Sequence, residues 1–436
     1  MKRGTITMEL WYKNDLRDPG MGTGKTVVLG IQHMFTMFGA TVLVPILIGM
    51  DISVALLMAG TGTLLFHLVT GGGIPVFLGS SFAFIAPIIA ATSRYGLPSA
   101  LGGVAVAGLV YVVIAVLVYF AGAQKILGFF PPVVTGSIII VIGLNLAPVA
   151  INMASTNGLE NVNATAWLLA LLSFAVVIAV SIYVKGFLKL LPVLAGLVVS
   201  YAAAALLTLT GVAELIDFTP IKEAAWFGLP ALTMAEFDIS AILLVAPVAV
   251  VTMVEHIGDM MAVGSICGRD FIKKPGLHRT IIGDGLATAF SALFGGPANT
   301  TYSENTGVLA LTRVLNPTVM RIAAVFAICL SFIPKLGAVI SSIPSAIIGG
   351  ISIVLFGMIA SVGARILVEN KVNFQLSRNM IIAAVILVLG IGGAMIPITI
   401  GSGDRQVSFE IHGMALAAIV GIILNKVLPS GEKKAK

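Results

Sequence analysis

The sequence predicts an all-α polytopic membrane protein that crosses the bilayer fourteen times. The chain of 436 residues is 58% hydrophobic and only 10% charged, whereas soluble domains are about 25% charged. Apolar stretches of about 20 residues, the length of a membrane-spanning helix, recur along it. Two further stretches are interrupted by polar residues, which predicts broken helices within an otherwise continuous pattern.

Twelve continuous stretches and two interrupted ones make up the predicted segments. The continuous segments are residues 27–49, 53–70, 98–121, 127–150, 164–184, 188–209, 239–264, 280–295, 316–334, 337–362, 379–399 and 411–428, and the interrupted ones are 74–92 and 298–313. Because the number is even, both termini lie on one side. Cytoplasmic loops are enriched in Lys and Arg. If both termini are cytoplasmic, most of the 25 Lys and Arg residues lie on the cytoplasmic side. The four that lie on the outer side are Arg94, Lys222, Lys335 and Arg405.

An internal repeat relates the two halves of the chain. The matched pairs, each 223 residues apart, are Gln32-His33 with Glu255-His256, Ser81 with Glu304, and Gly72-Gly73 with Gly295-Gly296. Each half holds seven segments, an odd number, so the second half must run inverted in the membrane. Inverted repeats with paired broken helices place a substrate site at the bilayer midplane, between the two breaks.

The repeat and the tails divide the chain into five regions. The first residues lack the apolar core of a cleavable signal peptide, so we expect a cytoplasmic tail. The predicted regions are a cytoplasmic tail at 1–26, a first repeat at 27–210, an extracytoplasmic linker at 211–237, a second repeat at 238–428 and a cytoplasmic tail at 429–436.

The second interrupted segment is the most polar stretch within the apolar part of the chain. We expect an extended piece over residues 299–302, followed by a half-helix that begins near Ser303. Polar backbone at membrane depth is tolerated only where protein buries it or where it lines a cavity. The start of the half-helix would present free backbone N–H groups and the positive end of its dipole beside Glu304 and Asn305.

Ionisable residues inside the membrane are the default functional candidates because each is costly to insert. They are His33, His67, Glu255, His256, Asp259, Asp284 and Glu304. Glu255 and Asp259 are four residues apart and share a helix face. Two acids on one face repel when both are ionised, so one is expected to hold a proton near neutral pH. This pattern favours a proton-coupled carrier, and the alternative is a structural network between helices.

The other ionisable residues allow more than one interpretation. His33 is either part of the proton pathway or a hydrogen-bonded packing residue. His67 lies near the end of a segment and is expected at the membrane interface. Asp284, between two glycines, is expected either to contact substrate or to support a close helix contact.

Several other classes of protein are excluded by the pattern of residues. Glu255-His256 is not the HExxH zinc arrangement, and no phosphate-binding glycine loop is present. Cys267 and Cys329 form no disulfide framework. The net charge of +6 is spread over short loops and does not indicate nucleic-acid binding. We therefore expect no enzymatic activity, no metal site and no cofactor other than a coupling proton.

The sequence resembles the nucleobase–ascorbate transporter family over almost its whole length, and within it the bacterial uracil permeases. The family signature reads Glu304-Asn305-Thr306-Gly307, then VLAL, then Thr312, and the Gln-His pair of the first segment is Gln32-His33. Further matching stretches are FGATVLVP at 38–45, GSSFAFIAP at 79–87, PGLHR at 275–279 and NTTYSEN at 299–305.

The resemblance implies a core domain of segments 1–4 and 8–11 and a gate domain of segments 5–7 and 12–14. Segments 3 and 10 carry short antiparallel strands followed by half-helices. The core binds the substrate and moves against the gate, often within a homodimer in the lipid of the bacterial cytoplasmic membrane. It also implies binding roles for the acids Glu255 and Glu304, the amides at Phe82 and Ser303, and the ring-lining Ala40, Phe82 and Tyr302. Proton coupling would involve Glu255, Asp259 and His33, with support from Gln32, Ser81, Asp284 and Asn305.

The resemblance predicts proton-coupled import of uracil by alternating access. Uracil has two N–H donors and two carbonyl acceptors, which carboxylates and half-helix amides can match. Two positions depart from the uracil permease pattern, because Asp259 and Asp284 stand where His and Asn are familiar. Acids at both positions occur in xanthine and uric-acid carriers, although purine carriers usually have Gln at the position of Glu304. The alternatives are therefore a xanthine, uric-acid or mixed symporter, an anion exchanger of the same fold, or an intramembrane enzyme.

Overall fold

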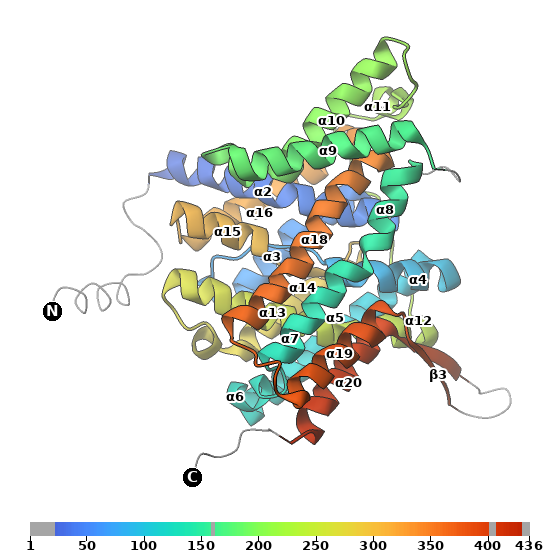
Figure 1. Ribbon diagram of the computed structural model, residues 1–436. Helices are drawn as coiled ribbons and strands as arrows, with labels where there is room; N and C mark the ends of the chain where they lie inside the picture. Colours follow the sequence, from blue (N-terminus) through green and yellow to red (C-terminus); the bar gives the residue numbers. More distant parts are fainter. Residues whose placement is uncertain (1–21, 158–161, 401–406, 430–436) are drawn as a thin grey trace.

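The computed structural model describes residues 22–157, 162–400 and 407–429, and these residues are mostly helical (Figure 1). In the first half the elements are α2 (Thr23–Ile48), α3 (Ile52–Thr70), β1 (Leu78–Ser80), η1 (Phe82–Phe84), α4 (Ile85–Tyr95), α5 (Leu97–Ala121), α6 (Ala123–Leu127), α7 (Pro132–Asn145), α8 (Ala147–Thr156), α9 (Ala164–Tyr183), η2 (Phe187–Leu190) and α10 (Pro192–Leu209).

The second half follows the same order of long helices, a break and further helices. Its elements are α11 (Thr219–Glu223), α12 (Ile239–Val245), α13 (Val248–Cys267), η3 (Ile272–Gly276), α14 (Leu277–Leu293), β2 (Asn299–Thr301), α15 (Ser303–Thr312), α16 (Pro317–Ser331), α17 (Pro334–Ser341), α18 (Ser345–Glu369), α19 (Ser377–Ile391), β3 (Met395–Ile400), β4 (Val407–His412) and α20 (Gly413–Val427).

The helices identify the chain as an integral membrane protein. In the described part of the chain, eight helices are long and apolar enough to cross a bilayer, or nine if α16 and α17, bent by 84°, count as one. Shorter apolar helices cover Phe82–Tyr95, Ser377–Ile391 and Gly413–Val427. A helix lies in each of the fourteen predicted segments, and the number of crossings stays a prediction.

The two interrupted segments meet as a small antiparallel sheet. β1 pairs with β2 in the register Leu78 to Thr301, Gly79 to Thr300 and Ser80 to Asn299. The predicted extended piece and the predicted start of the half-helix at Ser303 are therefore confirmed. From this sheet α4 and α15 leave in opposite directions, and they lie on opposite sides of the molecule in Figure 1.

Side chains of the surrounding helices bond to the backbone along the outer edges of this sheet. The Thr63 hydroxyl of α3 accepts a hydrogen bond from the Leu78 amide at 2.9 Å. The Thr288 hydroxyl of α14 donates to the Asn299 carbonyl at 2.6 Å. The Asn299 side chain in turn donates to the Met58 carbonyl at 2.7 Å. Non-helical backbone is tolerated at membrane depth only when protein satisfies it in this way.

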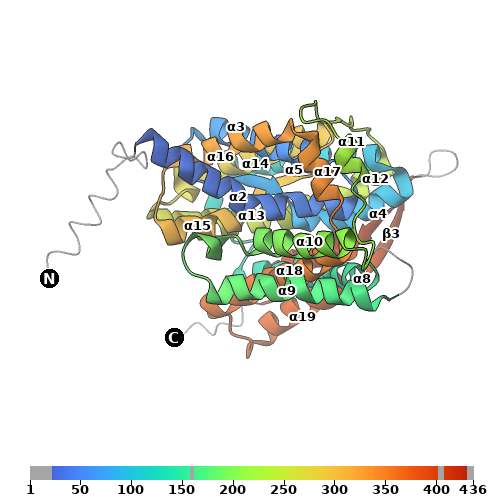
Figure 2. The same cartoon turned by 90° about the horizontal axis from the view of Figure 1, so that it is seen from above.

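The long helices pack in two groups. α14 packs extensively on α5 and α3, and α16 on α3 and α2, whereas α18 packs on α7, α8 and α9, and α19 on α20 and α7. Figure 2 shows α3, α14 and α16 on one side of the molecule and α9, α18 and α19 on the other. The division of the chain into a core and a gate domain stays a prediction.

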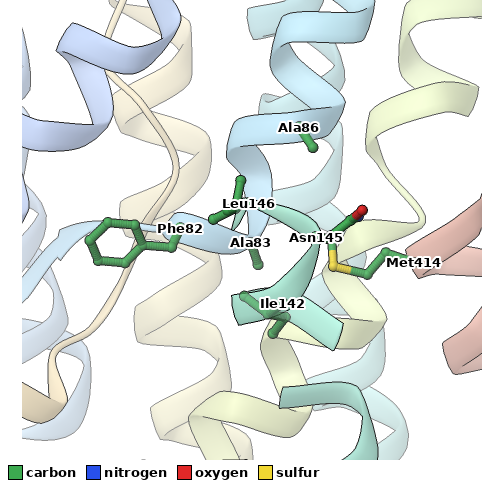
Figure 3. Close-up of a pocket in the computed structure, with 7 residues that line it drawn as sticks. All are labelled: Phe82, Ala83, Ala86, Ile142, Asn145, Leu146 and Met414. Carbon is green, nitrogen blue, oxygen red and sulfur yellow. The ribbon is translucent and has the colours of Figure 1, made fainter. Parts of the chain in front are cut away.

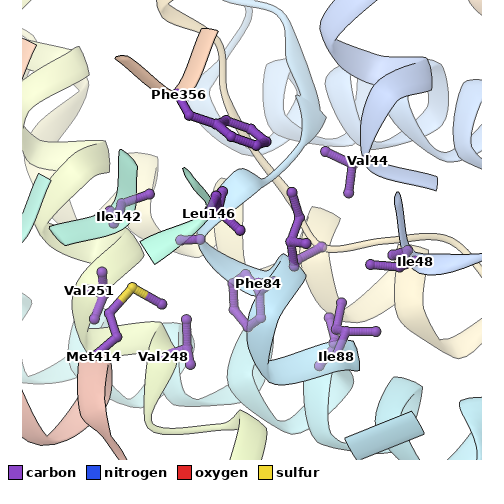
Figure 4. Close-up of a cluster of buried hydrophobic side chains, with 14 of the residues drawn as sticks. Val44, Ile48, Phe84, Ile88, Ile142, Leu146, Val248, Val251, Phe356 and Met414 are labelled. Carbon is purple, nitrogen blue, oxygen red and sulfur yellow. The ribbon is translucent and has the colours of Figure 1, made fainter. Parts of the chain in front are cut away.

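An apolar cluster fills part of the space between the two groups (Figure 4). One side contributes Val44 and Ile48 of α2, Phe84 and Ile88 beside β1, and Val248 and Val251 of α13; the other contributes Ile142, Leu146, Phe356 and Met414. All ten side chains are buried. We call this set of ten residues the apolar seal.

Two predicted segments end differently in the structure. The segment predicted at 379–399 is a helix only to Ile391, and its end is strand β3, which pairs with β4. A short apolar run such as residues 395–400 does not by itself distinguish a strand from a helix. The segment predicted at 337–362 is shifted along the chain, since Pro344 caps a helix that begins at Ser345.

The structure buries His67 inside the protein, and its depth in the membrane stays a prediction. Its side chain is 3% exposed, and its Nε2 lies 3.0 Å from the Val76 carbonyl oxygen. The chain turns back after α3 and the extended residues before β1 cover the end of that helix. Position near a segment end therefore did not indicate exposure.

Candidate functional site

The candidate site lies where the two half-helices begin, on either side of the β1–β2 sheet. Tyr302 donates its backbone N–H to the Phe77 carbonyl at 3.0 Å, and Ser81 donates its own to the Ala298 carbonyl at 2.9 Å. These two bonds extend the sheet by one residue at each end. The start of η1 at Phe82 and the start of α15 are thereby held together, which brings two sets of helix N-terminal amides to one place.

Four carboxylates gather around this point. Glu255 of α13 lies within electrostatic reach of Asp259, Glu304 and Asp284. Glu304 stands in the first turn of α15, where the positive end of the helix dipole favours a negative charge. Glu255 and Glu304 are half-buried, while Asp259 and Asp284 are buried. The structure thus brings together the two acids predicted to bind the base and the two predicted to support coupling.

Asp259 forms a hydrogen bond with a residue of β2 in addition to its interaction with Glu255. Its Oδ2 accepts a hydrogen bond of 2.9 Å from the Thr301 hydroxyl at the end of β2. The shared helix face of Glu255 and Asp259 is confirmed, since both lie in α13 and interact. The sequence analysis did not identify Thr301 as a site residue. Its position in the polar extended piece, close to Glu304 in the sequence, was the signal that could have found it.

His33 and Asn305 form a second polar contact behind the site. The Asn305 side-chain amide lies 3.2 Å from His33 Nδ1 and donates to the His33 carbonyl at 3.2 Å. Both side chains are buried. Because this contact joins α2 to the first turn of α15, His33 holds the half-helix that carries Glu304. Gln32, its neighbour, is half-buried, and its side chain makes no hydrogen bond within the described residues.

Phe82, Tyr302 and Ala40, predicted to line the ring, occupy different surroundings. Phe82 is half-buried and meets Phe356 of α18 edge to face, with ring centroids 6.1 Å apart. Tyr302 is buried and donates its hydroxyl to the Ser80 carbonyl at 3.0 Å. Its ring lies against Gly79, where a Cβ would stand 2.5 Å from the ring. Ala40 is 2% exposed. Of the three, Phe82 is the side chain exposed between the two helix groups.

A small apolar pocket lies beside Phe82, next to the apolar seal (Figure 3). It is too narrow to admit a water molecule, and it is lined by Phe82, Ala83, Ala86, Ile142, Asn145, Leu146 and Met414. Asn145, at the end of α7, is the polar lining residue. The pocket lies toward α4, on the side of the site that the seal closes.

The opposite side of the site is open. One turn beyond the two acids stand Gly258 and Gly307, and no atom lies within 4 Å of where their Cβ atoms would be. The exposed face of α13 continues through Met261 and Ser265 to a cleft of about 520 Å³ at the end of that helix. We call this side of the site, from the two glycines to the cleft at the end of α13, the open route.

This arrangement provides hydrogen-bond acceptors, hydrogen-bond donors and an aromatic surface. Ionised Glu255 and Glu304 are hydrogen-bond acceptors only, and the helix starts are donors. In residues 22–157, 162–400 and 407–429, no cluster of three or more His, Cys, Asp or Glu side chains is arranged to hold a metal ion. The site suits a flat, uncharged molecule with N–H groups on one edge and carbonyl groups on another.

Broken helices that meet in the middle of a bundle are typical of membrane transporters. Residues 24–399 match the Permease family, and the chain belongs to this family. It is 47% identical to the uracil permease of Bacillus caldolyticus over 95% of this chain and 94% of that protein. It is also 47% identical to the uracil permease of Bacillus subtilis (strain 168), over 94% and 93% of the two chains. The chain is accordingly a transporter and not an enzyme.

Other relatives and solved structures extend this result. The chain is 42% identical to the putative pyrimidine permease RutG of Escherichia coli (strain K12), over 94% of this chain and 91% of that protein. The transmembrane domain of the cyanobacterial bicarbonate transporter BicA has a TM-score of 0.62 at 16% identity, covering 92% and 96%. The murine anion transporter Slc26a9 has a TM-score of 0.67 at 11% identity, covering 98% and 72%. These structures share the fold.

Proposed function

We propose that the chain is a proton-coupled symporter that imports uracil across the cytoplasmic membrane of a bacterium by alternating access. The observation that carries the proposal is the meeting of Glu255 and Glu304 at the paired helix starts. Identity of 47% to proteins named uracil permeases supports the choice of substrate.

Recognition of uracil would divide between the two breaks. Glu255 and Glu304 accept the two ring N–H groups, and the backbone amides at Phe82 and Ser303 donate to the two carbonyl oxygens. The Phe82 ring covers one face of the base. Each donor and acceptor of uracil then has a partner, which matters because an unmade buried hydrogen bond costs about 1–3 kcal/mol.

Proton coupling follows from the charge of the site. Four carboxylates in a medium of low dielectric constant cannot all remain ionised, so a proton enters with the substrate on the Glu255 and Asp259 pair. His33 takes part by holding Asn305 and the half-helix. The proton is the coupling ion, and no other cofactor is needed.

This coupling predicts how uptake responds to pH. In vesicles, uracil uptake is expected to rise as the outside pH falls, because a proton bound outside is carried inward, and to collapse when a protonophore is added. Uphill accumulation that survives loss of both the proton gradient and the membrane potential would remove proton coupling from the proposal.

The fold proposal is fourteen segments in two inverted repeats, with core and gate domains and both termini in the cytoplasm. The opposite directions of α4 and α15 support inversion. Pro131 and Pro344 support it further, because they cap α7 and α18, the first gate helices of each repeat. The apolar seal and the open route support alternating access, with this conformation open toward the cytoplasm. The core is proposed to move against the gate within a homodimer surrounded by lipid.

A second candidate function is transport of xanthine, uric acid or both kinds of base. Asp259 and Asp284 favour it, because acids at these positions resemble the purine carriers. An anion exchanger is disfavoured although the solved neighbours carry bicarbonate or other anions, because three acids lie within reach of Glu255 and would repel an anion.

Uptake of radiolabelled uracil into proteoliposomes tests these functions together. Uracil import that unlabelled uracil inhibits and sulfate does not is the expected result. Inhibition by xanthine with equal potency would favour mixed specificity. Absence of uracil uptake under a proton gradient, in liposomes that contain folded protein, would overturn the proposal.

A further inference from the structure

A buried histidine and aspartate face each other on the side of α13 away from the open route. His256 Nδ1 lies 3.5 Å from Asp284 Oδ2, and both side chains are completely buried. His256 follows Glu255 directly in α13, whereas Asp284 comes from α14. Within the described residues, none of these imidazole nitrogens and carboxylate oxygens has a well-aligned hydrogen-bond partner, and the contact between the two side chains is at ion-pair distance. The two groups therefore depend on each other.

The groups around this pair are few and can be named by element. From α3, Phe66 meets the imidazole edge to face with ring centroids 6.4 Å apart. From α5, the buried phenol of Tyr111 interacts electrostatically with Asp284. From α13 itself come Glu255 and Asp259, and from β2 the backbone of Thr301 lies beside Asp284. In this set His256 is the only group that can carry a positive charge.

The negative charge of the nearby carboxylates indicates a role for the His256–Asp284 pair. Four carboxylates, Glu255, Asp259, Asp284 and Glu304, interact with one another, and two of them, Asp259 and Asp284, are buried. Burial of one unpaired charge is expensive, and a buried charge is ordinarily paired or neutralised. A proton shared between His256 and Asp284 makes that pair neutral as a whole. The changing charge is then confined to the remaining acids that face the open route.

We propose that His256 is a positioning residue for proton coupling: it keeps a permanent proton between itself and Asp284, so that the transported proton resides on Glu255 and Asp259. The inference deepens the proposed symport and rests on it. It separates a fixed proton, enclosed by α3, α5 and α14, from a transported proton on the side of α13 that opens to the route. Neither His256 nor Asp284 needs to touch the base.

Removal of one partner should change how binding depends on pH. In His256→Gln, Asp284 adds an uncompensated negative charge near Glu255, and the transported proton is held more tightly. The pH above which uracil binding is lost should rise by about one unit, the effect of one charge about 10 Å away at an effective dielectric constant of about 20. Asp284→Asn removes the negative charge and should not raise that pH.

The double variant His256→Gln with Asp284→Asn is the matched control. Its two amides are neutral and can hydrogen-bond to each other, so its pH profile should return to within about 0.3 unit of the parent, as expected for a coupled pair. If His256→Gln does not fold, folding itself becomes the measurement. Recovery of a folded protein in the double variant supports the pair, and failure of the double variant to fold overturns it.

Two measurements on purified full-length protein complete the test. Uracil binding is titrated from pH 5 to 9, and the unfolding temperature without ligand is followed over the same range. The inference is supported if the midpoint pH of either profile is higher in His256→Gln than in the parent and returns to the parent value in the double variant. Identical profiles for all variants, or a rise that persists in the double variant, would overturn it. A parent that binds no uracil contradicts the proposed function instead, and the unfolding profiles then test the pair alone.

Discussion

The two breaks, in the interrupted segments 74–92 and 298–313, have the same backbone arrangement but different side chains. Each consists of a three-residue strand followed by a half-helix, and the two strands are neighbours in one sheet. The first break, with Ser81 and Phe82, carries no ionisable side chain at its helix start. The second carries Glu304 and Asn305, which bond or interact with α2 and α13.

This difference indicates that the repeated backbone supplies the geometry and one repeat supplies most of the specific contacts. Paired strands and helix starts provide amides from both breaks regardless of side chain. In the proposed function, the acid at one break and the aromatic ring at the other would complement different parts of one planar molecule. Apart from Phe82, a substitution at the first break should therefore affect packing or have little effect, whereas a substitution at the second break should act strongly on binding.

The largest effect is expected for Glu304→Gln. The amide offers a donor where the carboxylate accepts, so one ring N–H of uracil loses its partner, at a cost of about 1–3 kcal/mol. Uracil affinity should fall roughly tenfold to hundredfold, as measured by calorimetric titration of the purified variant.

The competing role for Glu304 is stabilisation of the helix start through the dipole, worth about 0.3–1 kcal/mol. Under that role the variant would unfold at a slightly lower temperature, and uracil affinity would stay within about threefold. The same titration with xanthine sharpens the comparison, because a gain for xanthine would favour mixed specificity.

An intermediate effect, on stability, is expected for Gly79→Ala in the first break. The added methyl group would stand 2.5 Å from the Tyr302 ring, and overpacking of this kind costs about 1–3 kcal/mol. The unfolding temperature should fall. Gly258→Ala is the matched control, since its Cβ meets open space and alanine is the better helix former. Equal unfolding temperatures for the two variants would show that the strands are not tightly packed there.

The smallest effect is expected for Ser81→Ala, at the position that corresponds to Glu304 in the repeat. The Ser81 hydroxyl is buried and has no hydrogen-bond partner within the described residues, while its backbone amide, which the substitution keeps, pairs with Ala298. Uracil affinity should stay within about threefold. A tenfold loss would mean that the first break contributes a side chain to binding, and the comparison of the two breaks would fail.

The sequence by itself determined the class of protein, the two breaks and the half-helix start at Ser303. These features depend on local composition, because the bilayer demands long apolar segments and exposes any polar interruption. The offset of 223 residues also led to the two breaks, which the structure places side by side. The hairpin of β3 and β4 was missed for the same local reason, since a short apolar run fits either a helix or a strand.

Only the tertiary structure decided which polar groups meet. Asp259 bonds to Thr301 over 42 residues, and Asn305 bonds to His33 over 272 residues. His67 proved to be buried, and His256 proved to face Asp284 rather than the open route beside Glu255. Such contacts depend on the rotation and packing of whole helices, which local sequence does not specify. The helix periodicity predicted the shared face of Glu255 and Asp259, and the neighbouring helices determine what each acid contacts.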